Sequence, residues 1–110
     1  MKSVIYARLA VSDPQSMKKQ IERINEMIGN TEGMEAVKVF TEYGGGFGDE
    51  LPPIMSETIR FCKENNIHLV VMRDISRLAQ FHKNDIDIWF ISENVHSMKI
   101  SFDSIFTQMT

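Results

Sequence analysis

The 110-residue sequence has a single cysteine, Cys62, and no stretch of about 18 consecutive apolar residues. One cysteine cannot form a disulfide within the chain and is typical of a reducing compartment, so we expect a cytoplasmic protein. The missing apolar stretch predicts no membrane-spanning helix. The first apolar run is interrupted by Arg8, which is not the pattern of a secretory signal.

The sequence also lacks the spaced ligands of a metal site and the loops that bind nucleotides. The three histidines, His68, His82 and His96, are far apart, and the lone cysteine completes no metal-binding motif. The glycine-rich stretch 44–48 has neither the Gly-Lys-Ser/Thr ending of a phosphate loop nor the spacing of a dinucleotide fingerprint. We therefore expect no metal and no cofactor.

Basic residues are not in excess: 12 Lys and Arg stand against 15 Asp and Glu, a formal net charge of −3. This balance argues against tight DNA binding by the chain alone, because phosphate contacts need clustered basic side chains, but it allows a local basic site. The 43% of apolar residues is enough for a hydrophobic core. The length fits one domain over residues 1–110.

Segments with the apolar pattern of strands alternate with segments that have the pattern of helices. The predicted strands cover residues 3–8, 36–42, 67–73 and 99–102, and the predicted helices cover 13–29, 54–66 and 83–96. This order predicts an α/β fold of three layers (α/β/α) around a mainly parallel sheet of four strands or slightly more.

Parallel sheets bind ligands beyond the carboxyl ends of their strands. Arg8 and Arg77 follow two predicted strands, and the loop 43–53 follows a third, so we expect them at one edge of the sheet. A guanidinium can bind two oxygens of a phosphate, and two of them would make a phosphate site. The alternative is that each arginine pairs with a nearby carboxylate, such as Glu42 or Asp74.

Ser12 has two interpretations. The sequence Ser-Asp-Pro-Gln at residues 12–15 is a capping box, so Ser12 is predicted to cap the first helix, a contribution of roughly 1 kcal/mol. The other interpretation is a nucleophile beside Arg8, but the loop offers no base to activate a serine hydroxyl. The capping role is favoured.

Three stretches together resemble the serine recombinases, the family of resolvases and invertases. Residues 6–9 (Tyr-Ala-Arg-Leu) with residues 16–20 resemble the start of that family, and residues 70–80 resemble its second motif. Residues 94–96 (Asn-Val-His) resemble its approach to the last strand. The resemblance extends over about residues 3 to 104.

The resemblance implies a resolvase-like fold and DNA as the substrate, with a homodimer or larger assembly. Such domains cleave DNA through a 5′-phosphoserine link and need no metal, while arginines stabilise the charge on the phosphate. By position, Arg8 matches the first active-site arginine and Arg77 the arginine of the second motif. Ser76 matches a position that is often Asp. The long dimerisation helix and the DNA-binding modules that follow in the family have no counterpart within residues 1–110.

The sequence departs from the family at its reactive positions. Ala10 occupies the position of the nucleophile and has no atom that can attack phosphorus. Gly44 replaces the usual serine of the glycine loop, while Leu51 and Gln80 replace two arginines. The resemblance therefore implies a domain whose catalysis is impaired.

Three functional hypotheses follow. In the first, the chain is a recombinase homologue in which Ser12 substitutes for the missing nucleophile. In the second, it is a non-catalytic interaction or regulatory module that keeps the recombinase fold, which the combination of Ala10, Leu51 and Gln80 favours. In the third, it is an unrelated binder of nucleotides or small ligands that uses the glycine loop.

Overall fold

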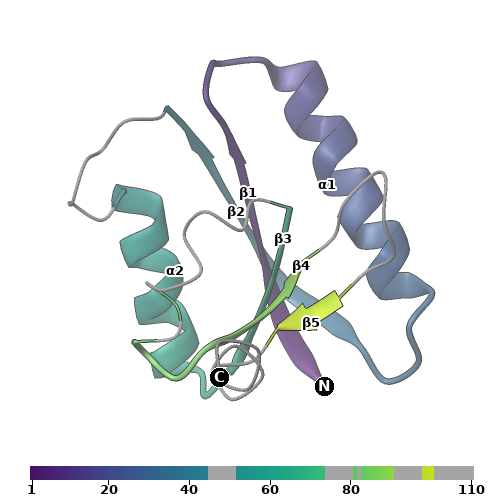
Figure 1. Ribbon diagram of the computed structural model, residues 1–110, viewed down its shortest axis with the longest axis vertical. Coiled ribbons are helices and arrows are strands. Elements are labelled where there is room, and N and C mark those ends of the chain that lie inside the picture. Colours follow the sequence, from purple (N-terminus) through teal and green to yellow (C-terminus); the bar gives the residue numbers. More distant parts are fainter. Residues whose placement is uncertain (45–51, 74–80, 82, 91–97, 101–110) are drawn as a thin grey trace, which may run out of the picture.

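The computed structural model describes residues 1–44, 52–73, 81, 83–90 and 98–100, and Figure 1 shows a sheet with one helix on each face. The elements in chain order are β1 (Lys2–Leu9), α1 (Pro14–Gly29), β2 (Glu35–Tyr43), α2 (Pro53–Glu64), β3 (Leu69–Met72), β4 (Asp87–Phe90) and β5 (Met98–Ile100).

The strands form one sheet in the order β2-β1-β3-β4-β5. β1 pairs in parallel with β2 and β3, β3 pairs in parallel with β4, and only β5 is antiparallel to its neighbour. With α1 on one face and α2 on the other, this confirms the predicted three-layer α/β/α fold with a mainly parallel sheet (Figure 1). The order makes β2 an outer strand, whereas β1 and β3 are central.

Each helix buries the apolar face that its sequence predicts. The core between α1 and the sheet contains Met17, Ile24 and Ile28 with Ile5, Ala7 and Val71. The core between α2 and the sheet contains Met55, Ile59 and Cys62 with Val4, Tyr6 and Phe40. Each fully buried side chain of this size contributes roughly 1.5–3 kcal/mol relative to exposure, so the two cores fix both helices against the sheet.

The predicted helix over residues 83–96 is wrong for its first half, because residues 87–90 form strand β4. β4 pairs with β3 from Leu69↔Asp87 to Met72↔Phe90. The sequence misleads here because an inner strand has apolar residues on both faces. Ile88 packs in the core under α2 while Trp89 packs against the core under α1. Residues 91–96 lie outside the described residues.

The cap of α1 also differs from the prediction by one residue. Asp13 is the N-cap, and its carboxylate accepts hydrogen bonds from the backbone N–H and the hydroxyl of Ser16, at 3.2 and 2.8 Å. Proline is favoured in the first helical position, and Pro14 takes it, so the preceding residue becomes the cap. These hydrogen bonds, that of the Ser16 hydroxyl first, lower the pKa of Asp13 from its ordinary value. Ser12 lies exposed before the cap.

Among the described residues, no helix has the length and apolar character that crossing a membrane requires.

Candidate functional site

The carboxyl ends of the neighbouring strands β1 and β3 bring two arginines to one place. An open hollow at this edge is lined by Arg8, Leu9, Ala10, Gln20 and Arg73. Arg8 is the second-to-last residue of β1, and Arg73 directly follows β3. β3 pairs with β1 through Val4↔Val70 and Ile5↔Val71. Convergence at this edge was predicted for Arg8 and Arg77; the structure places Arg8 here with Arg73, and Arg77 lies outside the described residues.

Gln20 ties the end of β1 to helix α1. Its side-chain oxygen accepts the backbone N–H of Arg8 at 3.3 Å, and its amide nitrogen donates to the Arg8 carbonyl at 3.4 Å. Both hydrogen bonds are long, so each is weak, but together they satisfy both backbone groups of Arg8. Gln20 is only 6% exposed, which is unusual for a glutamine. The sequence signal is a polar residue on the otherwise apolar face of α1.

A buried carboxylate joins β2 to β1 and to the start of α2. Glu42, near the end of β2, is 4% exposed and accepts a hydrogen bond from the Tyr6 hydroxyl. It also accepts the backbone N–H groups of Ile54 and Met55, at 2.9 and 3.2 Å. These are orphan donors in the first turn of α2, whose own cap residue, Pro52, supplies no side-chain acceptor. The sequence predicts Glu42 only as a partner for an arginine, and no local pattern indicates this capping role.

The loop that leaves β2 is also fixed to β1. The backbone N–H of Gly44 donates to the Leu9 carbonyl at 2.9 Å, and Gly44 has a φ of 111°, a conformation that favours glycine. Glu42 and Gly44 therefore anchor the start of the glycine-rich loop beside the hollow. Residues 45–51 of that loop lie outside the described residues.

The predicted site residues are only partly described. Arg8 and Ala10 line the hollow together, and Ala10 is exposed on the bend after β1. Ser12 is exposed two residues further on and is not among the lining residues. Ser76 and Arg77 lie outside the described residues, so their roles stay predictions.

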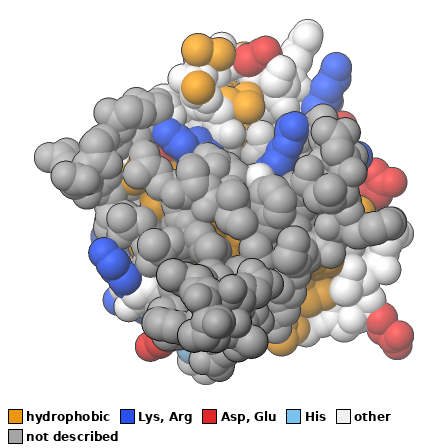
Figure 2. Space-filling model, in the orientation of Figure 1, with side chains coloured by type: hydrophobic (Ala, Val, Ile, Leu, Met, Phe, Trp, Pro, Cys, Tyr) orange, Lys and Arg blue, Asp and Glu red, His pale blue; other side chains and the backbone are white. Residues whose placement is uncertain are grey.

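The charged side chains that the structure describes at this edge are arginines, a residue type that binds anions. Two guanidinium groups around a hollow suit the oxygens of a phosphate. None of the described side chains that line it, those of Arg8, Leu9, Ala10, Gln20 and Arg73, is a nucleophile or a general base. In the described part of the chain, no three His, Cys, Asp or Glu side chains are grouped as metal ligands. On the face in Figure 2, the Lys and Arg side chains of the described residues lie apart from one another.

Comparisons with known proteins agree with this architecture. The structure is similar to the C-terminal catalytic domain of ISC1926 TnpA, an IS607-like serine recombinase, with a TM-score of 0.69 and 15% identity over 99% of this chain and 78% of that one. It is similar to the N-terminal catalytic domain of TP901-1 integrase, with a TM-score of 0.71 and 20% identity over 99% of this chain and 90% of that one. At these identities the likeness concerns the fold.

A search of curated proteins gave no match. The family model of the resolvase N-terminal domain matches residues 3–110, nearly the whole sequence. The chain therefore belongs to the resolvase N-terminal domain family.

Proposed function

We propose that this chain is the recombinase-type domain of a site-specific DNA recombination system and that it holds a DNA phosphate without cleaving the strand. The observation that carries the proposal is the position of Ala10. It lies with Arg8 and Arg73 around one hollow, and the family resemblance implies a nucleophilic serine at this position. Alanine cannot form that link, while the arginines keep the means to bind the phosphate.

The arrangement around Arg8 supports binding as the retained activity. Gln20 binds both backbone groups of Arg8, Glu42 joins β2 to the start of α2, and Gly44 joins the end of β2 to Leu9 of β1. These contacts preorganise the edge of the sheet and do not need the nucleophile. Because the chain is acidic overall, we expect the affinity for DNA to be modest and to fall steeply with salt.

Direct binding tests the retained activity. Fluorescence anisotropy with labelled duplex DNA at low salt should give saturable binding that weakens in Arg8→Gln and in Arg73→Gln. Lys18→Gln is the matched control, because Lys18 is exposed on α1 and paired with Glu22 at 3.9 Å, away from the hollow. Equal binding by all four proteins would contradict a phosphate site at Arg8 and Arg73.

Ser12 remains the alternative nucleophile. It lies exposed just before the cap of α1, within the same connection as Ala10. If Ser12 replaces the usual serine, wild-type protein nicks supercoiled DNA and Ser12→Ala does not. We expect no nicking by either protein.

A second candidate function is that of a non-catalytic interaction module within the same recombination system. It is favoured by a separate observation, the exposed apolar side chains along the outer strand β2. This function does not depend on the hollow at Arg8, and the two roles are compatible.

A further inference from the structure

The outer strand β2 has unusual features for the edge of a sheet. β1 is the only strand that pairs with β2 among the described residues, so the far side of this nine-residue strand is not paired there. Three of the five exposed large hydrophobic side chains of the described chain lie on β2: Val37, Val39 and Tyr43, exposed by 37%, 38% and 38%. Exposed apolar edges are templates for pairing with another strand.

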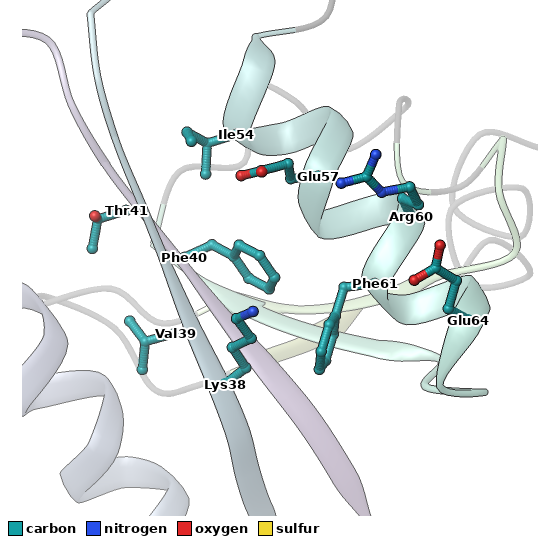
Figure 3. A pocket seen from close by; sticks show the side chains of 9 residues that line it. All are labelled: Lys38, Val39, Phe40, Thr41, Ile54, Glu57, Arg60, Phe61 and Glu64. Atoms are coloured by element: carbon teal, nitrogen blue, oxygen red, sulfur yellow. The ribbon is translucent and has the colours of Figure 1, made fainter.

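A groove runs along the same edge on the face covered by α2. It is lined by four consecutive residues of β2, 38–41, and by the facing side of α2, which includes Glu57, Arg60 and Phe61. Figure 3 shows Lys38, Phe40 and Phe61 turned toward one another, while Val39 and Thr41 point to the other side of the strand. The ammonium of Lys38 lies 5.1 Å from the ring centre of Phe40 and 4.9 Å from that of Phe61. An added strand would therefore contact apolar surface on both faces.

The charges on the rim of the groove form a pattern that is complementary to itself. Glu57 and Arg60 are both exposed and lie one helical turn apart. Contacts at Glu42–Ile54 and Phe40–Phe61 show that α2 runs antiparallel to β2. Counted from the Glu42–Ile54 contact with rises of about 1.5 Å per helical residue and about 3.3 Å per strand residue, the midpoint between Glu57 and Arg60 falls beside Phe40.

We propose that β2 is a docking edge for a second copy of this chain, with the two β2 strands antiparallel about a two-fold axis at Phe40. This axis sets Glu57 of one subunit beside the partner's Arg60, and the reverse, so the interface contains two ion pairs. On the other face it sets Val37 opposite the partner's Tyr43 and Val39 opposite the partner's Thr41. A two-fold interface requires such self-complementarity.

This pairing differs from dimerisation through a long helix, and it does not depend on the phosphate site. It extends the sheet continuously across two subunits through backbone hydrogen bonds, with the side chains of both faces giving specificity. In the dimer, the exposed apolar side chains Val37, Val39 and Tyr43 of β2 are covered by the partner strand. Their exposure in the single chain is then explained by their role in the interface.

Analytical ultracentrifugation of the full chain over a range of concentrations tests the proposal. Wild-type protein should show a monomer–dimer equilibrium, and Val39→Lys should weaken the association by about tenfold or more, because it places a charge where apolar contacts form. Val11→Lys is the matched control, since Val11 is an exposed valine outside β2 and its substitution should leave the equilibrium unchanged.

Charge exchange then tests the axis itself. Glu57→Arg and Arg60→Glu should each weaken the dimer by about tenfold or more, because each places like charges opposite one another. The double variant Glu57→Arg/Arg60→Glu should restore it. Circular dichroism spectra close to that of the wild type, recorded at concentrations where all the proteins are monomeric, show that the variants are folded, as expected for exposed positions.

A chain that stays monomeric up to about 1 mM overturns the proposal. In that case the β2 edge would pair, if at all, with a strand of a different protein. A dimer that is unaffected by Val39→Lys overturns it as well, because the association then uses another surface. A double charge variant that fails to restore the dimer overturns the two-fold axis at Phe40.

Discussion

The carboxylate of Glu42, near the end of β2, accepts the backbone N–H of Ile54 in the first turn of α2 at 2.9 Å. The same carboxylate accepts the Tyr6 hydroxyl from β1, so one buried side chain joins two strands and a helix beside the candidate site. Hydrogen bonds to a buried charged group are stronger than neutral ones, and their donors are costly to leave unpaired.

Glu42→Gln should therefore destabilise the protein by about 1–3 kcal/mol, because the amide turns an NH₂ group toward donors that need an acceptor. Urea unfolding at pH 7 measures the loss. Glu22→Gln is the control, since Glu22 is exposed and its substitution should change the free energy of unfolding by less than about 0.5 kcal/mol. Equal effects at the two positions would refute the role of Glu42.

Gln20 should matter more for the local order of Arg8 than for global stability. In Gln20→Leu the new side chain suits the apolar face of α1, so we expect a free energy of unfolding within about 1 kcal/mol of wild type. The backbone N–H of Arg8, which now donates to Gln20, should exchange with solvent faster. Amide hydrogen exchange by NMR measures this, and unchanged protection of Arg8 would mean that Gln20 does not position it.

The cap of α1 distinguishes Asp13 from Ser12. Asp13→Ala should lower the urea midpoint, whereas Ser12→Ala should leave it nearly unchanged, because the hydrogen bonds to Ser16 come from Asp13. The pKa of Asp13 is lowered in the folded state, so its contribution is present above its ordinary pKa of 3.8. That contribution is lost as the pH falls through the lowered value. The difference between Asp13→Ala and wild type should therefore shrink in acid.

Cys62 should behave as a packed apolar side chain. Burial raises the pKa of its thiol from 9.0 to about 11, so at pH 8 the native thiol is protonated and inaccessible. We expect a thiol reagent to react at the rate of unfolding and rapidly in urea. Because the folded pKa is the higher one, the stabilising effect of the neutral thiol is complete below pH 9.0 and is lost as the pH rises toward about 11. Rapid reaction of the native protein at pH 8 would contradict this burial.

The sequence predicts the parts of the fold that depend on local patterns. Both helices have apolar residues on one face, and the first three strands are β-branched runs between turns, so periodicity finds them. The sequence pattern does not predict β4, because it is an inner strand with apolar side chains on both faces. Ile88 packs in one core and Trp89 against the other, so the alternation of apolar and polar residues that is typical of a strand is missing.

The sequence predicts only those site residues whose position follows from a local pattern, such as the end of a strand. Arg8 and Ala10 are predicted from their place at the carboxyl end of the first strand. Gln20 and Glu42 act through contacts with residues at least 12 positions away, which no local pattern encodes. The roles of Ser76 and Arg77 stay predictions.

The central claim is that the domain has the fold and the arginines of a recombinase site but lacks its serine nucleophile. Trapping of covalent protein–DNA complexes tests this claim most directly. End-labelled duplex DNA with a nick in one strand is incubated with the protein. The products are then separated by electrophoresis under denaturing conditions. We predict no labelled band at the mass of a protein–DNA adduct for wild type or Ser12→Ala. An adduct that the wild type forms at a 5′ phosphate and that disappears in Ser12→Ala would contradict the account and identify Ser12 as the nucleophile.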